Sequence, residues 1–252
     1  GVSSAAWDVY KRELNLFSSK TISRHSWFYQ IREYCILYGL PHPLKLLSSP
    51  LPKQTYKKHV KKKVIDYWEL ILRAEASPLP SLTYFKPSFM SLTKIHPIWR
   101  TAGCSPTKVA MAVVQARMLS GRYRTEYLCR HWSKNREGFC LLAENCNSTI
   151  EEIPHILAFC PALTKTREKL VKYTIAYCKQ IPHLSNIIFT FLVPHHPLYS
   201  HFLIDCSTIP EIISATQTYG FETLNHLFQI TRTWCYNLHR ERMKILGRWN
   251  IL

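Results

Sequence analysis

The spacing of apolar residues along the chain predicts a series of amphipathic helices. In residues 5–17, the residues Trp7, Tyr10, Leu14 and Phe17 recur every three or four positions, with charged residues between them. The same helical period, with prolines or glycines at the boundaries, predicts further helices over residues 26–38, 57–72 and 105–120, and after Pro161, Pro210 and Gly220.

The apolar faces of these helices define the expected core. In the last helix six residues form one stripe, which indicates packing in the core rather than a ligand site: Leu224, Leu227, Phe228, Thr231, Trp234 and Leu238. The basic residues that lie mostly off this stripe are Arg232, Arg240, Arg242, Lys244 and Arg248. The other expected buried faces are Phe28, Ile31, Cys35 and Tyr38; Val109, Val113, Ala116 and Leu119; and Leu163, Leu170, Val171 and Ile175.

Two stretches lack a clear period. Residues 76–97 contain four prolines among apolar residues, and we expect an ordered connector there. Residues 181–197 are apolar and interrupted by proline, which leaves a short strand and a loop as alternatives. We therefore expect a mainly α fold with helical domains around a small zinc-binding module and little or no β structure, at most a short pair of strands beside the metal. The expected regions are 1–100, 101–165 and 166–252.

The net charge of the chain indicates the class of its binding partner. The chain of 252 residues has 33 Lys and Arg against 16 Asp and Glu, which gives a formal net charge of +17. Such an excess favours a polyanionic partner, above all nucleic acid and less so an acidic membrane face. The alternative is a basic protein whose charge serves solubility alone.

Cysteine usage and hydropathy bear on location. The chain has nine cysteines, an odd number without a regular framework, which favours a reducing intracellular compartment over a secreted disulfide scaffold. The apolar stretch 187–193 is far too short to cross a bilayer, so we expect no membrane partner. No charged and apolar leader follows Gly1, so we expect no signal peptide, and the missing initiator Met suggests a fragment or a processed product.

Several catalytic classes are disfavoured by what the chain lacks. Its three aspartates, Asp8, Asp66 and Asp205, are scattered, whereas polymerases and nucleases hold two metal ions with closely placed carboxylates. None of the seven glycines belongs to a phosphate-binding loop. We therefore expect no catalytic motif in this segment.

Three cysteines and a histidine fall within twenty-one residues, in the pattern C-x5-C-x8-H-x4-C formed by Cys140, Cys146, His155 and Cys160. Thiolate and imidazole ligands favour zinc, and four protein ligands are typical of a closed structural site. A regular helix would turn His155 and Cys160 about 140° apart, so we expect the helix to end before Cys160, where Pro161 follows.

Other interpretations of this motif remain open. Three buried free cysteines and a core histidine would give the same residues. Cys129 or His131 also lies close enough upstream to replace one ligand. Glu151 and Glu152 precede Pro154, and we expect them to complement the positive end of the helix that begins there.

Two basic segments are candidate contacts for nucleic acid. The first is a run of lysines that would bind phosphates without sequence choice: Lys57, Lys58, Lys61, Lys62 and Lys63. The second interleaves basic residues with rings that can stack on unpaired bases: Arg117, Arg122, Tyr123, Arg124, Arg130, His131, Trp132, Lys134 and Arg136. The alternatives are a solvated helix face for the lysines, and a core position for Tyr123, Tyr127 and Trp132.

A set of short motifs occurs in one order along the chain: residues 27–28, 40–44, 66–69, 116–132, the cysteines at 140 and 146, residues 154–163 and residues 231–236. Together they resemble the carboxyl-terminal region of reverse-transcriptase proteins from non-LTR (LINE-type) retrotransposons of animals. The resemblance touches most of the chain and is strongest around the cysteine and histidine motif.

That resemblance implies a CCHC zinc knuckle downstream of a polymerase thumb, with Cys140, Cys146, His155 and Cys160 as its ligands. The paired aspartates and the endonuclease of such proteins have no counterpart in this segment. It also implies binding of the element's RNA, of target DNA or of both during target-primed reverse transcription. The expected partners are these nucleic acids and the polymerase domain of the same polypeptide, in a nuclear and cytoplasmic ribonucleoprotein.

Three functional hypotheses follow. The preferred one is a zinc-stabilised nucleic-acid-binding module, in which the metal holds the basic segment in shape without reacting. The second is a helical protein-interaction scaffold, in which the stripe from Leu224 to Leu238 docks a polymerase domain or another subunit. The third is a hydrolase with an open zinc site and Glu144 or Glu152 as general base, which the closed ligand set disfavours.

Overall fold

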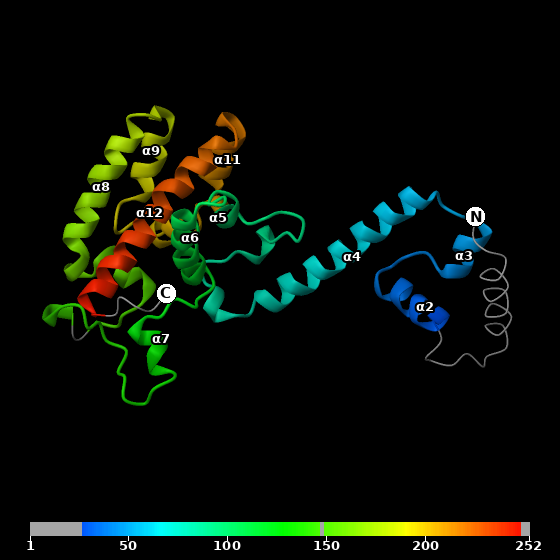
Figure 1. The fold of residues 1–252 in the computed structure, drawn as a ribbon, viewed down its shortest axis with the longest axis horizontal. Coiled ribbons are helices and arrows are strands. Elements are labelled where there is room, and N and C mark those ends of the chain that lie inside the picture. The colour runs from blue at the N-terminus through cyan, green and yellow to red at the C-terminus, as the bar shows by residue number, and fades with distance from the viewer. Residues whose placement is uncertain (1–26, 147–148, 248–252) are drawn as a thin grey trace. The chain divides into compact units, whose positions relative to one another are not determined.

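The computed structural model describes residues 27–146 and 149–247 (Figure 1). The helix expected over residues 5–17 and the side chains of Phe28 and Arg248 lie outside the described residues. The chain divides into two compact units, of which the first ends at Leu72 and the second begins at Arg73. The regions expected from the sequence, with boundaries at 100 and 165, do not coincide with this division.

The first unit contains helices α2 (Trp27–Leu37) and α3 (Pro43–Ser48), and the boundary between the units falls within α4 (Lys53–Ala76). The predicted helix over 26–38 is confirmed. The rings of Tyr38 and Tyr67 meet edge to face with centroids 5.1 Å apart, which packs the end of α2 against α4. No residue of α4 is buried, so its lysines are open to solvent.

The second unit is organised around its last helix, α12 (Glu222–Ile245). In Figure 1 this helix lies between α8 (Thr164–Cys178) and α6 (Pro106–Leu119), and α10 (Tyr199–Asp205) and α11 (Pro210–Tyr219) also pack against it. All six residues of the predicted stripe are buried, so the expected core face is confirmed. The remaining elements are η1 (Pro80–Leu82), η2 (Pro87–Phe89), α5 (Pro97–Arg100), α7 (Glu126–Arg130), η3 (Glu144–Cys146), η4 (His155–Phe159), η5 (Pro161–Leu163), α9 (Pro182–Phe191) and η6 (Cys206–Thr208).

Buried polar side chains join other helices to α12. The side-chain amide of Gln115 donates to the carbonyl oxygen of Leu203 at 2.9 Å and to Oγ1 of Thr231 at 3.1 Å. The indole Nε1 of Trp234 donates to Oγ1 of Thr174 at 2.9 Å. A buried donor without a partner would cost about 1–3 kcal/mol. Gln115 and Trp234 avoid this cost because each of these donors has an acceptor inside the core.

The buried face of α6 differs from the predicted one. Val109, Val113 and Ala116 are half-buried. Because the amide of Gln115 is bonded inside the core, the helix turns its neighbouring positions inward, and its buried residues are Ala112, Val114, Gln115, Met118 and Leu119.

The buried face of α8 was also predicted wrongly in part. Leu170 is buried as expected, but Val171 and Ile175 are 37% and 42% exposed. Thr174 and Cys178 take the inward positions instead. Thr174 can lie there because its hydroxyl donates to the carbonyl oxygen of Leu170 at 2.8 Å. A pattern based on apolar residues alone does not detect a threonine whose hydroxyl is satisfied within its own helix.

Two arginines that were expected off the core stripe are buried. Arg232 is 1% exposed, and its Nη2 donates to Oγ1 of Thr101, at the end of α5. Arg242 is 2% exposed and belongs to the site described below.

Residues 181–197 contain helix α9 rather than a strand or a loop alone. Pro182 lies in its first turn, where a missing N–H group costs nothing. Leu184, Ile188 and Phe191 follow at helical spacing and are buried. The high density of apolar residues concealed this period in the sequence.

The expected connector over residues 76–97 is ordered by long-range hydrogen bonds. The Arg73 guanidinium donates to the carbonyl oxygen of Met90 at 2.7 Å, and Nζ of Lys86 donates to that of Thr208 at 3.1 Å. Gly121 has a φ of 65°, and a Cβ there would meet the carbonyl oxygen of Ser81. Glycine is therefore required where the connector approaches the end of α6.

The fold class is confirmed as mainly helical. Among the described residues the backbone forms no strand, and Phe139 and Ile150 make one isolated antiparallel bridge beside the candidate metal centre. Across residues 27–146 and 149–247, none of the helices combines the length and the apolar character that crossing a membrane requires.

Candidate metal centre and adjoining basic cavity

The four predicted metal ligands lie together. The ligand atoms of Cys140, Cys146, His155 and Cys160 are all within 4.8 Å of one another, and all four residues are buried. Sγ of Cys140 is 3.9 Å from Sγ of Cys160, and Sγ of Cys146 is 3.7 Å from Nε2 of His155. A tetrahedron with metal–sulfur bonds of roughly 2.3 Å has edges of about 3.8 Å, which these distances match. The group could hold one metal ion.

A short antiparallel contact positions the first part of the group. The N–H of Cys140 donates to the carbonyl oxygen of Thr149 at 2.9 Å, and the N–H of Glu151 donates to that of Gly138 at 2.9 Å. Between these segments the turn η3 ends at Cys146. The two cysteines therefore reach the same point from opposite ends of one loop.

A π-helical turn, η4, positions the second part. The N–H of Cys160 donates to the carbonyl oxygen of His155 at 2.7 Å, five residues earlier. In a regular helix these two residues would point about 140° apart, and the wider turn brings them to one side. Cys160 then adopts an extended conformation, with ψ of 117°, before Pro161. The prediction that the helix ends before Cys160 is confirmed, but the π-helical turn was not predicted.

Burial changes the protonation of the four ligands. It raises the pKa of the Cys140 thiol to about 11 and also raises the pKa of the Cys146 and Cys160 thiols. Burial likewise lowers the pKa of His155. Without an ion the group therefore favours neutral thiols and a neutral imidazole, so a metal ion must displace the thiol protons in order to bind.

A cation lies beside the group. Nη2 of Arg167 donates to the carbonyl oxygen of Cys160 at 2.5 Å, and the charge of Arg167 acts on the thiols of Cys146 and Cys160. Three thiolates and a neutral imidazole around a divalent ion leave one surplus negative charge. Arg167 is placed to offset that charge.

The two substitute ligands lie outside the group. Cys129 is buried without joining it, and His131 is exposed. In the part of the chain that the structure describes, no second cluster of three or more His, Cys, Asp or Glu ligands occurs. All nine cysteines are free thiols.

Glu151 connects the metal ligands to the basic segment. Its fully buried carboxylate accepts hydrogen bonds from Nε of Arg242 at 2.7 Å, from Nη2 of Arg242 at 2.9 Å and from the N–H of Glu126 at 2.7 Å. In the sequence Glu151 lies between the ligands Cys146 and His155. We call the segment from Cys146 to His155 the metal loop. Contacts that fix the metal loop therefore also fix α12 and the start of α7.

The expected role of Glu151 was wrong. Its carboxylate complements the N-terminus of α7 and the guanidinium of Arg242 instead of the helix that begins at Pro154. Glu152 is exposed. Burial by itself would lower the pKa of Arg242. The hydrogen bonds to Glu151 and the negative charges of neighbouring groups together outweigh burial and raise that pKa, so the guanidinium stays charged.

A cavity of about 510 Å³ adjoins this ion pair, and we call it the basic cavity. Five arginines line it and no acidic residue does: Arg117, Arg122, Arg124, Arg136 and Arg242. Its other walls are formed by Tyr123, Cys129, Trp132, His239 and Met243. The basic cavity thus gathers much of the predicted nucleic-acid segment around one concave surface.

Most of that predicted segment is accessible. The exposed residues are Arg117, Arg122, Arg124, His131, Trp132 and Lys134. Arg130 and Arg136 are half-buried: the Arg130 guanidinium lies 4.3 Å from the centre of the Tyr127 ring, and Nη1 of Arg136 lies 2.8 Å from the buried carboxylate of Glu126. These two arginines are held by neighbours within the chain.

The predicted stacking role of Tyr123 is contradicted. This residue is 4% exposed, and its hydroxyl lies 3.1 Å from Nδ1 of His239. A ring this deeply buried cannot stack face to face on a base from solvent, although it forms part of the cavity wall. Trp132, which is 59% exposed, is accessible for stacking on a base.

In the first unit the five predicted lysines, Lys57, Lys58, Lys61, Lys62 and Lys63, are all exposed on α4. Their exposure is compatible with a solvated helix face and with a phosphate-binding surface.

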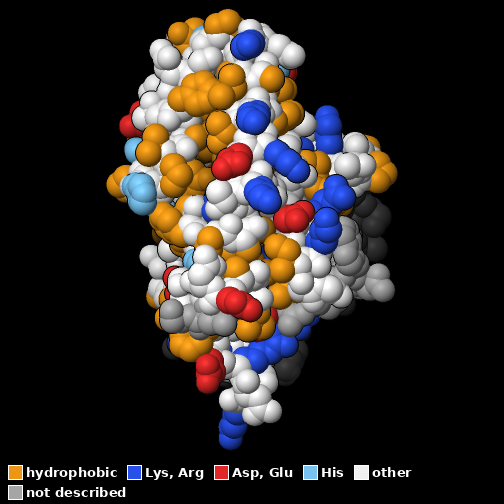
Figure 2. Space-filling view, turned by 90° about the vertical axis from the view of Figure 1, so that its left-hand side faces the viewer, with side chains coloured by type: hydrophobic (Ala, Val, Ile, Leu, Met, Phe, Trp, Pro, Cys, Tyr) orange, Lys and Arg blue, Asp and Glu red, His pale blue; other side chains and the backbone are white. Residues whose placement is uncertain are grey.

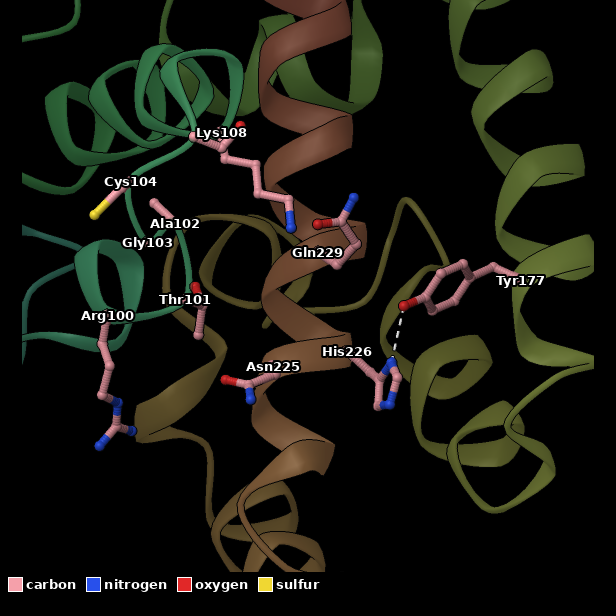
Figure 3. A pocket seen from close by; sticks show the side chains of 11 residues that line it. Arg100, Thr101, Ala102, Gly103, Cys104, Lys108, Tyr177, Asn225, His226 and Gln229 are labelled. Carbon is pink, nitrogen blue, oxygen red and sulfur yellow. Dashed lines mark hydrogen bonds between the residues drawn. The ribbon is translucent and has the colours of Figure 1, made fainter.

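A second cavity, of about 680 Å³, lies at the other end of the α6 and α12 pair (Figure 3). Lys108 of α6 points toward Gln229 of α12, and the hydroxyl of Tyr177 lies 2.8 Å from Nδ1 of His226. Arg100 turns away from these side chains and lies over an aromatic ring. This cavity is polar but much less cationic than the basic cavity.

Lysine and arginine side chains also gather on the face of the second unit that carries α8 (Figure 2). The exposed lysines of α8 are Lys165, Lys169 and Lys172. Positive charge is therefore spread beyond the basic cavity, which makes site-specific substitutions necessary in any binding test.

Glu151, His239 and Arg242 were not predicted as parts of the site. One signal was available for Arg242, which lies four residues after Leu238 and so continues the apolar stripe of α12. A charged residue at a core position indicates a buried partner. Periodicity gives no such signal for Glu151, whose partner lies 91 residues away.

No protein-family model matches the chain, and neither a curated protein sequence nor a solved structure is similar to it.

The metal site can be tested with two cysteine variants. We expect the wild-type chain to bind about one equivalent of a divalent metal ion, as a four-ligand site does. Cys146→Ser should weaken binding by more than about 100-fold, since even changes outside the ligand set cost roughly 10- to 100-fold. Cys129→Ser, which alters a buried cysteine outside the group, should retain the metal. Equal losses in the two variants, measured by metal analysis after dialysis, would contradict the assignment.

The neighbouring residues Glu151 and Glu152 provide a matched test of the ion pair between Glu151 and Arg242. Glu151→Gln leaves Arg242 buried without its anion and should lower the free energy of unfolding by about 3 kcal/mol. Glu152→Gln alters an exposed residue and should change it by less than about 0.5 kcal/mol. Urea unfolding of the metal-loaded chains measures both. A Glu151→Gln variant as stable as the wild type would contradict the claim that the ion pair stabilises the fold.

Proposed function

We propose that this chain is a zinc-stabilised nucleic-acid-binding module without a catalytic role of its own. One observation carries the proposal: Arg242, one of five arginines that line a single cavity, bonds to Glu151, which lies in sequence between two members of the buried Cys3His group. The net charge of +17 supports the same class of partner.

Zinc suits the ligand set best among common ions. Three sulfur atoms and one imidazole nitrogen are soft ligands, which calcium and magnesium do not favour. Four protein ligands at tetrahedral separations fill the coordination of zinc and leave no position for a reacting water. The ion would then serve to hold the loop of Glu151 in place.

The arginines of the basic cavity would supply affinity. Arg117, Arg122 and Arg124 are exposed, and among residues 27–146 and 149–247 none of them forms an ion pair with a carboxylate. Guanidinium groups bind phosphate through paired hydrogen bonds, and each neutralised phosphate releases condensed counterions. The exposed lysines of α4 would add contacts of the same kind in the first unit.

The resemblance to non-LTR retrotransposon proteins suggests the setting. In that setting the chain would bind the element's RNA, target DNA or both, beside the polymerase domain of the same polypeptide. The ribonucleoprotein would be found in nucleus and cytoplasm. The arginines of the basic cavity suit a polynucleotide, and this is the support that they give to the retrotransposon setting.

The two other hypotheses have less support. The stripe from Leu224 to Leu238 is buried in the core of the second unit, so it offers no free surface for docking. Glu144 and Glu152 are exposed, and neither belongs to the metal-ligand group, which weakens the case for a hydrolase.

The proposal is tested by measuring binding of the zinc-loaded chain to single-stranded and duplex RNA and DNA at several salt concentrations. We expect affinity to fall steeply with salt. The double variant Arg122→Gln and Arg124→Gln should reduce the slope of log affinity against log salt by about 1.4 for single strands, or about 0.7 for each lost phosphate contact.

A control removes the same charge elsewhere. Lys94→Gln and Lys179→Gln together alter two exposed cations outside the basic cavity, and we expect less than a twofold change in affinity. An equal effect of both double variants would mean that binding follows net charge rather than the cavity. Absence of binding to every nucleic acid at low salt would contradict the proposed function.

A further inference from the structure

We propose that the basic cavity receives one unpaired nucleotide, with its base against the inner wall and its flanking phosphates at the rim. The inference rests on the proposed function and specifies which part of a polynucleotide this cavity binds.

The size of the basic cavity suits such a ligand. Its volume of about 510 Å³ falls within the range of roughly 300–1,000 Å³ that is typical of sites for small molecules and cofactors. A base within a duplex cannot enter a closed pocket unless it leaves the stack, whereas an unpaired base can do so at little cost.

The rim of the cavity carries free positive charge. Arg117, Arg122 and Arg124 are its exposed arginines, and no carboxylate among the described residues pairs with them. The other two arginines of the cavity are already paired with buried carboxylates. Uncompensated charge therefore lies at the mouth, where the phosphates on either side of an inserted base would be.

The inner wall is neutral. Tyr123, Cys129 and His239 are each at most 8% exposed. Burial lowers the pKa of His239 to about 4, and the charges of Arg242 and Arg117 act in the same direction, so the ring is neutral at pH 7. These three side chains carry no charge, so a base would find uncharged contacts against them.

The same wall contains one neutral donor that faces no partner within the pair, namely the Nε2–H of His239 when the Tyr123 hydroxyl bonds to Nδ1. Burial raises the pKa of Tyr123 to about 12, so its hydroxyl keeps its proton, and it lies 3.1 Å from Nδ1 of His239. When that hydroxyl donates to Nδ1, the proton of the imidazole is on Nε2. Because His239 lines the cavity, this N–H would serve as the donor to a carbonyl or a ring nitrogen of a base.

Trp132 completes the arrangement at the rim. Its ring is 59% exposed and lines the cavity. Stacking of one base on such a ring increases affinity by roughly 5- to 150-fold. The cavity thus combines a ring for stacking, a neutral inner donor and outer cations, which are the contacts that a single nucleotide of an unpaired segment requires.

The test uses the zinc-loaded full chain and short duplexes, in RNA and in DNA, that contain a single bulged nucleotide. Each duplex is compared with one that has the same phosphates but no base at the bulge, and with a fully paired duplex. We expect the intact bulge to bind at least about fivefold more tightly than the abasic bulge, as stacking of one base requires.

Three variants locate the effect. Trp132→Ala should reduce the preference for the intact bulge to less than about twofold, and Trp132→Phe should retain it because a ring remains for stacking. Lys108→Gln, in the second cavity, should retain the full preference. A photoreactive base at the bulge should crosslink to residues of the basic cavity, such as Trp132 or Met243.

Three results would overturn the inference, in distinguishable ways. If intact, abasic and paired duplexes bind equally tightly, the chain binds nucleic acid through the backbone alone and the nucleotide pocket is wrong. If no duplex or single strand binds, the proposed function fails with it. Crosslinks confined to residues outside the basic cavity would also reject the pocket.

Discussion

The buried ion pair between Glu151 and Arg242 is the contact on which the candidate site depends. Its carboxylate is inaccessible to solvent and is satisfied by the guanidinium of α12 and by the first N–H of α7. Removing one member of such a pair costs several kcal/mol, because the other charge stays buried. Three segments that are distant in sequence, namely the metal loop, α7 and α12, are therefore held in one arrangement.

This arrangement gives a metal ion a structural means of affecting binding. The ligands Cys146 and His155 lie on either side of Glu151 in the sequence, so an ion that orders them also orders the carboxylate between them. Arg122, Arg124 and Arg136 of the basic cavity lie on either side of α7, whose start this carboxylate holds, and Arg242 bonds to the carboxylate directly. On this account the ion acts by constraint, without taking part in any reaction, and the arginine-lined surface acts on phosphates through charge and hydrogen bonds.

The sequence predicted much of this architecture, for identifiable physical reasons. The stripe of α12, the helix starts at proline and the grouping of Cys140, Cys146, His155 and Cys160 follow from local spacing, and the structure confirms the stripe, the starts and the grouping. The errors concern long-range pairing: Tyr123 is buried because His239 completes its hydrogen bonding, and Arg242 is buried because Glu151 neutralises it. No local pattern shows that a polar group will find its partner a hundred residues away. The π turn at His155 was likewise beyond prediction, because regular helical spacing does not describe it.

We expect metal binding to order the start of α7 and, through it, the basic cavity. Amide hydrogen exchange of the full chain with and without zinc measures this ordering, because local opening determines the rate of exchange at each N–H. Zinc should slow exchange at Glu126, whose N–H bonds to Glu151, and in the rest of α7, while α9 and α11 exchange at unchanged rates. Protection confined to the segment from Cys140 to Cys160, with α7 unaffected, would contradict this expectation.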